Sequence, residues 1–321
     1  KNRSRGDTMN EKKMTFMSSD GEHELKAKCW LPDGDVRGVL QIVHGMNEYI
    51  ARYEGFARFM TENGFAVAGD DHLGHGESAN GDEELGWFGE SGGADYLTED
   101  EHLFHDLLRT EFPDVPYFLL GHSMGSFITR NYVASYEDEL TGYICMGTAG
   151  KNTALPVAKL LSRIIRDTKG ARYRSEFLKN LSFTGYNDHF KDENDPNAWL
   201  SRNLESRKQY GADPWTQFTF TTQGYRDLYQ LLDDVTGTKW AEKIRKTLPI
   251  LIVSGDMDPV GSCGRGPEEV YSWLEEIGMK DVTLKLFRGD RHELLNETNR
   301  YEIYRYLLDW MDRTTEKSGI Q

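Results

Sequence analysis

The sequence predicts an α/β fold built on a mainly parallel sheet. Short apolar runs of strand type alternate with segments of helical spacing, first over residues 24–146 and again over residues 250–314. Strands that alternate with helices form parallel sheets whose two faces are covered by helices. The chain has 321 residues, of which 38% are apolar and 12% aromatic, and this is enough for a large core. We therefore expect a main α/β domain, with room for an insertion.

The expected elements follow in order along the chain. Residues 39–43 are a continuous apolar run with one glutamine, typical of a buried strand, and residues 51–63 then show helical spacing up to Gly64, a residue that favours helix C-termini. By the same criteria we expect strands at 24–31, 38–44, 65–69, 117–120, 142–146, 250–254 and 282–287. Helices are expected at 51–63, 98–112, 126–136, 267–277 and 300–314.

Residues 151–240 break this alternation. They contain a helical stretch at 155–168 and aromatic-rich polar stretches without a strand–helix rhythm. Open α/β sheets bind ligands at the carboxyl ends of their strands, so we expect a mostly helical cap inserted there. The expected domains are a core of residues 14–150 and 241–321 and a cap of residues 151–240. Residues 1–13 are expected to be disordered or left from an expression tag.

Charge and cysteine content exclude several classes of protein. The formal net charge of −15 would repel phosphate backbones, so no nucleic-acid partner is expected. Three cysteines cannot form a disulfide framework, and their odd number suits a reducing compartment. No apolar run approaches the roughly 20 residues of a membrane span, and no hydrophobic region follows the basic N-terminus as it would in a secretory signal. We therefore expect a cytoplasmic protein.

The segment Gly121-His122-Ser123-Met124-Gly125 carries the strongest functional signal. It lies between an expected strand and an expected helix, the context in which a serine sits on a strained turn with its hydroxyl projecting from the sheet. Glycine is needed two residues before and after the serine, because a side chain there would clash across the turn. Ser123 is therefore the expected nucleophile.

A serine nucleophile needs a base to take its proton and a carboxylate to orient that base. On a sheet of this type they follow the order serine, acid, histidine, each in a loop after a strand. Of the two histidines C-terminal to Ser123, His189 lies in the cap, whereas His292 follows the last expected strand, so His292 is the expected base. Asp256 and Asp258, in the turn after the preceding strand, both stay open as the acid.

An oxyanion hole needs two backbone N–H groups directed at the developing negative charge. The N–H of Met124, at the start of the helix after the nucleophile, is one candidate. The N–H of Met46 is the other, because it follows an early strand and Gly45 permits an unusual turn there. Both act through the backbone, so their side chains should be replaceable. This chemistry requires no metal and no organic cofactor.

A series of ordered motifs extends these assignments. They are residues 44–49 with Arg52-Tyr53, then 71–78, 121–126, 255–258 and 289–292. Together they resemble the α/β-hydrolase superfamily, and within it the monoacylglycerol lipase and lysophospholipase-like serine hydrolases. The resemblance implies an α/β-hydrolase fold, selects Asp258 as the acid, and makes residues 71–78 a structural loop near the site. One departure is His72, at a position where arginine is common in the family.

The resemblance implies an ester substrate that is lipid-like, a monoacylglycerol or a lysophospholipid. The cap should choose it, since its aromatic side chains offer apolar area for an acyl chain. We expect substrate contacts from Trp199, Trp215, Phe218 and Tyr225, although part of the cap's aromatic residues must instead form its own core.

Residues 155–172 form a basic amphipathic segment in an acidic protein. Leu155, Ala158, Leu161 and Ile165 fall on one helical face, and lysines and arginines surround them. Such a helix can make peripheral contact with an anionic membrane, or it can equally be a solvated lid helix.

Two other functions stay open. A serine aminopeptidase of the proline iminopeptidase type has the same fold and triad but needs an acidic patch in the cap for the substrate amine. The candidates for that patch are Glu176, Asp188, Asp192, Glu193 and Asp195. A non-catalytic ligand-binding protein of this fold is the second alternative. A complete nucleophile, base and acid argues against it.

Overall fold

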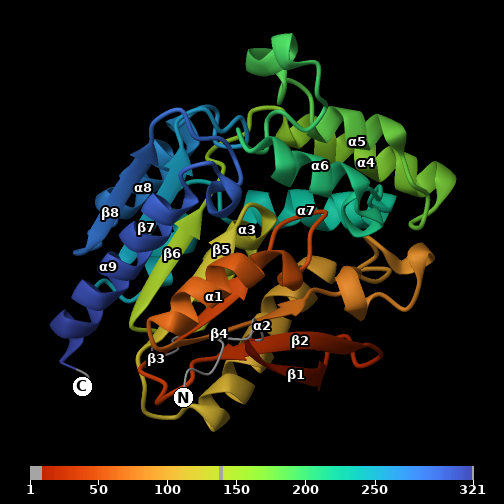
Figure 1. The fold of residues 1–321 in the computed structure, drawn as a ribbon. Coiled ribbons are helices and arrows are strands. Elements are labelled where there is room, and N and C mark those ends of the chain that lie inside the picture. Colours follow the sequence, from red (N-terminus) through yellow and green to blue (C-terminus); the bar gives the residue numbers. More distant parts are fainter. Residues whose placement is uncertain (1–8, 137–139, 320–321) are drawn as a thin grey trace.

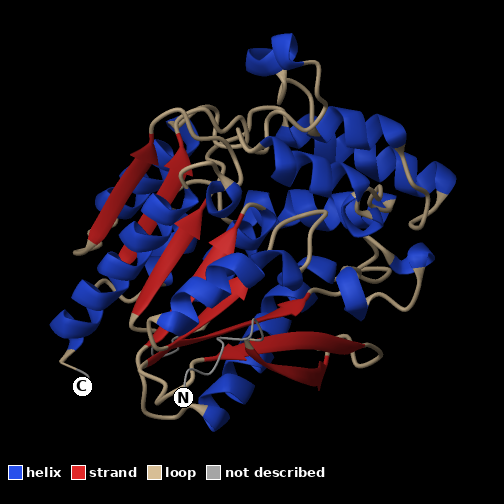
Figure 2. Cartoon of the chain, viewed as in Figure 1, coloured by secondary structure: helices blue, strands red, loops and turns tan. Residues whose placement is uncertain are grey.

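The structure is a computed structural model that describes residues 9–136 and 140–319. An eight-stranded sheet crosses the molecule in the order β1-β2-β4-β3-β5-β6-β7-β8 (Figure 1). β1, β2 and β4 pair antiparallel, and every pairing from β4 through β3 to β8 is parallel. Helices lie on both faces of the sheet (Figure 2), which confirms the fold class predicted from the sequence.

The elements have the following bounds. The strands are β1 (Asn10–Met17), β2 (Glu24–Leu31), β3 (Gly38–Val43), β4 (Phe65–Asp71), β5 (Tyr117–His122), β6 (Gly142–Met146), β7 (Ile250–Gly255) and β8 (Val282–Phe287). The helices of the core are α1 (Glu54–Glu62), α2 (Gly93–Glu111), α3 (Met124–Ser135), α8 (Arg265–Glu276) and α9 (Arg300–Ser318). Those between β6 and β7 are α4 (Leu155–Lys169), α5 (Glu176–Ser182), α6 (Leu204–Ala212) and α7 (Thr222–Asp234). Short 3₁₀ helices are η1 (Ile50–Tyr53), η2 (Gly76–Ser78), η3 (Asp82–Glu84), η4 (Asp188–Glu193), η5 (Pro214–Thr216), η6 (Lys239–Lys243) and η7 (Leu294–Asn296).

Two hydrophobic cores lie on opposite faces of the sheet. Val39 and Val43 of β3 belong to the core that includes residues of α2, α3 and α8, whereas Leu40 and Ile42 belong to the core that includes residues of α1 and α9. Successive strand residues point to opposite faces, so one strand supplies both cores. Every residue of β3 is buried, as expected for a parallel strand covered on both sides.

The N-terminal strand corrects one expectation. Residues 10–13, expected to be disordered, belong to β1, which pairs with β2 over its whole length. β1 is an edge strand that leaves most of its side chains exposed, so it lacks the apolar alternation by which a strand is recognised in a sequence. Residues 1–8 of that expected segment lie outside the described residues.

The helical insertion lies above the carboxyl ends of the parallel strands. Helices α4 to α7, green to teal in Figure 1, gather on that side of the sheet. α4 packs on α7, and α7 packs on α2 and α3 of the core. No strand forms within the insertion, all of whose residues are described, although one isolated bridge joins Arg174 to Thr221. The sheet edge that carries Ser123 is therefore covered by helices.

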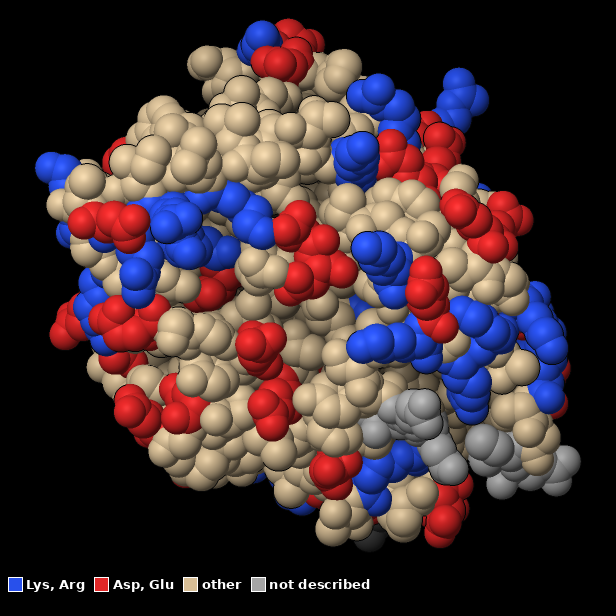
Figure 3. All heavy atoms as spheres, turned by 180° about the vertical axis from the view of Figure 1, so that it is seen from behind, with Lys and Arg blue, Asp and Glu red and all other residues tan. Residues whose placement is uncertain are grey.

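The surface carries both signs of charge. On the face seen in Figure 3, acidic and basic side chains are mixed over much of the area. Within the described residues, no helix is both long and apolar enough to cross a bilayer.

Candidate active site

Ser123 lies on a strained turn between β5 and α3. Its φ and ψ are 54° and −120°, a conformation that non-glycine residues rarely adopt. A Cβ atom on Gly121 would lie 2.1 Å from Thr129 Oγ1, and one on Gly125 would lie 2.1 Å from the carbonyl oxygen of Val43. Both positions thus require glycine, as the motif predicts. The turn exposes the Ser123 side chain to a cavity beneath the helical insertion.

His292 and Asp258 form a buried pair after β8 and β7. His292 Nδ1 lies 3.0 Å from both carboxylate oxygens of Asp258. The Asp258 carboxylate also accepts from the Val260 N–H at 2.9 Å and contacts Ser254 Oγ at 3.2 Å, and its side chain is fully buried. These bonds fix the carboxylate, which in turn holds the His292 ring through Nδ1.

Asp256 has a different environment. Its Oδ1 accepts a hydrogen bond from the Gly289 N–H at 2.6 Å, which ties the turn after β7 to the turn after β8. The geometry therefore separates the two aspartates that spacing alone left open: Asp258 contacts the histidine ring, and Asp256 holds the loop that leads to it.

The two amides expected to form an oxyanion hole lie beside the serine. Met124 is the first residue of α3, where N–H groups lack an intrahelical acceptor, and Met46 follows β3. Both residues line the same cavity as Ser123 and His292. Gly45 lies against Ser123, because a Cβ atom on Gly45 would come within 2.9 Å of Ser123 Cβ. No hydrogen bond joins Ser123 Oγ to His292 among the described contacts; in unliganded enzymes such bonds are often long and tighten with substrate.

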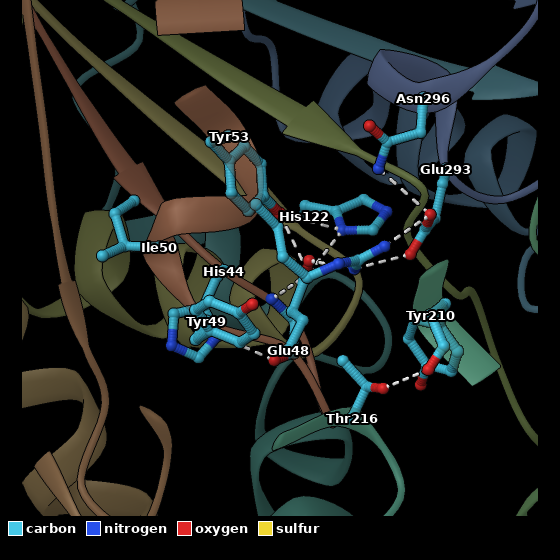
Figure 4. A network of polar contacts seen from close by, with 12 residues as sticks. His44, Glu48, Tyr49, Ile50, Tyr53, His122, Tyr210, Thr216, Glu293 and Asn296 are labelled. Atoms are coloured by element: carbon cyan, nitrogen blue, oxygen red, sulfur yellow. Dashed lines mark hydrogen bonds and ion pairs between the residues drawn. The ribbon is translucent and has the colours of Figure 1, made fainter. Parts of the chain in front are cut away.

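A polar network next to Ser123 was not predicted from the sequence. Glu48 Oε1 accepts from the Gly45 N–H at 2.6 Å and from the Tyr53 hydroxyl at 2.9 Å, and it lies 2.9 Å from His122 Nδ1 (Figure 4). Arg52 donates to Glu48 Oε2 at 3.0 Å. It also donates to the two carboxylate oxygens of Glu293, at 2.7 and 2.9 Å. The only sequence signal was that the network residues other than Glu293 lie within the motifs.

Charges explain the protonation of this network. Burial would raise the pKa of Glu48, but the hydrogen bond and charge of His122 and the Arg52 guanidinium hold it well below its usual range. Burial would likewise lower the pKa of His122, yet the bond to Glu48 and its negative charge raise that pKa above its ordinary value. The network therefore contains the ionised carboxylate of Glu48 close to the serine.

His72, which is also buried, contacts the segment that follows β3 at His44. His72 Nε2 donates to the carbonyl of His44 at 3.0 Å, while its Nδ1 lies 3.4 Å from Asp70 Oδ2 and 3.2 Å from Glu101 Oε1. Burial opposes its charge, but Asp70 and Glu101 raise the pKa of His72 well above its usual value. The three side chains offer ligand atoms close enough for a metal ion. Their contact distances instead fit a protonated ring between two acidic side chains.

The cavity over Ser123 has a volume of about 680 Å³, within the range of small-molecule sites. Apolar side chains from core and insertion line one part of it: Phe127, Leu155, Ala158, Leu181, Leu228 and Leu232. Polar and charged residues also line the cavity, among them Glu48, His122, Tyr210, Glu293, Lys151 and Arg265. The cavity is therefore amphipathic, and both Ser123 and His292 line it.

The expected cap contacts are corrected in part. Trp199 lines the cavity and its ring lies 5.1 Å from that of His292. Trp215, Phe218 and Tyr225 do not line it. Trp215 packs edge-on against Tyr49, Phe218 stacks on Phe220, and Tyr225 is fully buried beside Phe220. Aromatic content predicts packing area, but it does not tell which face of an insertion each ring meets.

The acidic residues considered as an amine site lie elsewhere. Glu193 pairs with Arg207 at 2.6 Å and with Arg291. Asp195 also contacts Arg207, at 3.3 Å. Glu176 and Asp188 pair with lysines on their own helices. Neither these residues nor Asp192 lines the cavity over Ser123.

Comparison with known proteins identifies the family of the chain. The profile of the family described as serine aminopeptidase, S33 (Hydrolase_4) matches residues 34–299. The chain belongs to this family. It is 28% identical over 291 residues to the monoglyceride lipase of Rattus norvegicus, covering 88% of this chain and 84% of the relative. It is 27% identical to the monoacylglycerol lipase of Mycolicibacterium smegmatis, covering 88% and 90%.

A solved structure places the fold within the same group. The thermostable carboxyl esterase from Bacillus coagulans, in complex with glycerol, superimposes with a TM-score of 0.88 and 30% identity over 96% of this chain and 99% of the esterase. The sheet order, the flanking helices and the helical insertion thus form an α/β-hydrolase fold.

Proposed function

We propose that this α/β-hydrolase is a serine hydrolase that cleaves lipid monoesters, with Ser123 as nucleophile, His292 as base and Asp258 as the residue that orients His292. The observation that carries the proposal is that Ser123 and His292, which is paired with Asp258, line one amphipathic cavity. Relatives over most of the chain are named monoglyceride lipases, which supports the same reaction class.

The reaction follows from this placement. His292 Nε2 takes the proton of Ser123 Oγ while the oxygen attacks the ester carbonyl, and the N–H groups of Met46 and Met124 stabilise the resulting oxyanion. The imidazolium, stabilised by Asp258, then protonates the leaving alcohol. In the second step His292 activates a water molecule that releases the fatty acid from Ser123. No step needs a metal or an organic cofactor.

The cavity lining assigns the two ends of the substrate. We place the acyl chain against the apolar lining from Phe127, α4 and α7, so that residues 151–240 serve as the cap that determines chain selectivity. The alcohol end then lies near Glu48, Tyr210 and Glu293. The two cations there, Arg52 and the protonated His122, are already bonded to Glu48 and Glu293, so neither is left to pair with the phosphate of an anionic head group. A neutral polyol fits better, so monoacylglycerol is the proposed substrate in preference to an anionic lysophospholipid.

This assignment predicts a head-group preference. At equal acyl chain, kcat/KM for a monoacylglycerol should exceed that for a lysophosphatidic acid by at least about tenfold, because Arg52 and His122 are already paired with carboxylates and cannot compensate the buried phosphate. The measurement is fatty-acid release from sonicated 1-oleoylglycerol and oleoyl lysophosphatidic acid, with 4-nitrophenyl esters of two to sixteen carbons to locate the preferred chain. Equal or faster cleavage of the lysophosphatidic acid would refute the neutral head group. Cleavage of aminoacyl arylamides but not of esters would favour the aminopeptidase alternative.

The outer face of α4 supports a contact with lipid surfaces. Leu155 and Ala158, expected on the apolar face, are buried and line the cavity. A second apolar row, Val157, Leu160 and Ile164, is at least half exposed to solvent and lies among basic residues. We infer that this row, rather than the one recognised in the sequence, rests on an anionic membrane surface.

Replacing residues of this exposed row should weaken vesicle binding without changing the hydrolysis of a soluble ester. The double variant Leu160→Glu and Ile164→Glu should lower the rate on monoacylglycerol in phosphatidylcholine–phosphatidylglycerol vesicles by about tenfold, since two buried leucine-sized contacts are lost. Hydrolysis of soluble 4-nitrophenyl butyrate should not change. Leu204→Glu, at an exposed leucine on α6, is the matched control. Unchanged vesicle cosedimentation of the double variant would argue against docking through α4.

The compartment is part of the same proposal. Cys29, Cys145 and Cys263 are all free thiols, which suits the reducing cytoplasm.

A further inference from the structure

A second histidine–carboxylate pair lies beside the nucleophile and has no part in the reaction steps above. His122 precedes Ser123 and is 5% exposed, with its Nδ1 2.9 Å from Glu48 Oε1 (Figure 4). Its ring centroid lies 4.8 Å from that of His292. Gly147 packs against both rings, because a Cβ atom on Gly147 would lie 3.2 Å from His122 Cδ2 and 3.3 Å from His292 Cε1.

On one side His122 reaches the loop of the proposed oxyanion hole through Glu48. The same Glu48 oxygen accepts the Gly45 N–H at 2.6 Å, and the Gly45 carbonyl faces His44 Nδ1 at 2.8 Å. Gly45 is therefore held at both its N–H and its carbonyl. Because Gly45 immediately precedes Met46, these bonds set the peptide whose N–H would meet the oxyanion.

On the other side His122 reaches the segment that carries the base. Its Nε2 lies 3.3 Å from the carbonyl oxygen of His292. A carbonyl and an ionised carboxylate only accept hydrogen bonds, so both contacts are satisfied at once when both ring nitrogens carry protons. The protonated ring thus connects the oxyanion loop to the backbone of the general base.

We propose, on the basis of the function proposed above, that His122 is a positioning residue. It holds the Gly45–Met46 segment of the proposed oxyanion hole and His292 in the relative positions needed for attack on the ester. It acts through Glu48 and through the His292 backbone and does not itself exchange a proton with the substrate. Its place is fixed by two contacts on opposite sides of one ring, within the cavity wall.

The charged groups around the ring define a pH dependence. Burial opposes its protonated form, whereas Glu48, Glu293 and the His292 carbonyl favour it, and the Tyr53 hydroxyl lies 3.2 Å from Nδ1. The balance raises the pKa of His122 above its usual value. The protonated ring is present below that pKa and is lost as the pH rises through it, together with the Nε2–H bond to His292. The alkaline side of the kcat profile should therefore contain a titration of His122.

The test compares His122→Gln with His105→Gln. His105 is also 5% exposed, but it lies on α2 against Tyr117, away from the cavity. With 4-nitrophenyl butyrate, His122→Gln should lower kcat about 10- to 100-fold with KM changed less than threefold, a part of the loss seen when an oxyanion donor is removed. His105→Gln should stay within twofold of the wild type. The alkaline limb of kcat should disappear in His122→Gln and move to lower pH in Glu48→Gln, which removes the negative charge.

Two results would overturn the proposal. One is a folded His122→Gln with kcat within threefold of the wild type; the other, which decides if that variant does not fold, is an unchanged alkaline limb in Glu48→Gln. Because the assay uses a soluble ester, failure of the monoacylglycerol assignment would leave this test intact. A folded wild-type protein with no esterase activity would instead contradict the proposed function.

Discussion

Replacement of Ser123 by alanine should lower kcat on 4-nitrophenyl esters by about 10⁴-fold or more. The substitution removes only the hydroxyl that would form the acyl-enzyme, and the remaining amides and cavity can supply only the residual catalysis seen in triad knockouts. The measurement is steady-state hydrolysis with thermal unfolding as a check on folding. Ser182→Ala is the matched control, because Ser182 lines the same cavity and bonds the Tyr229 hydroxyl. It should change kcat only a few-fold; comparable losses in both variants would contradict a nucleophilic role.

Asp258→Asn should reduce kcat by about 10⁴-fold, because an amide next to Nδ1 favours the wrong tautomer of His292 and cannot stabilise the imidazolium. Asp256→Asn should change kcat only a few-fold, since its remaining amide oxygen can still accept the Gly289 N–H. The pair is measured side by side on one ester across the pH range. A larger loss in Asp256→Asn than in Asp258→Asn would reverse the assignment of the acid.

The catalytic frame is predictable because it depends on local patterns at strand ends. The glycines around Ser123 reflect clashes of 2.1 Å that any larger residue would meet, so their spacing already encodes the turn. His292 and Asp258 follow apolar strands whose carboxyl ends meet at one edge of the sheet. Such a pattern can be recognised in the sequence because the backbone turn and the proposed chemistry require the same residues.

The insertion is less predictable because helical period does not say which face meets which neighbour. α4 has two apolar rows, and the row singled out from the sequence packs inward while the other is exposed. Trp215 and Phe218 pack on aromatic neighbours outside the cavity for the same reason. The Glu48–His122 contact joins residues 74 positions apart, so only the folded loop brings it together.

The central claim is that Ser123 is the acylated residue of a lipid monoesterase, and site mapping with a long-chain alkyl fluorophosphonate tests it most directly. The reagent phosphonylates an activated serine stably, and peptide mass spectrometry locates the adduct. We predict one equivalent of label on Ser123, formed in parallel with the loss of monoacylglycerol hydrolysis and prevented by Ser123→Ala. Label on another residue, or hydrolysis that persists after Ser123 is fully modified, would contradict the account.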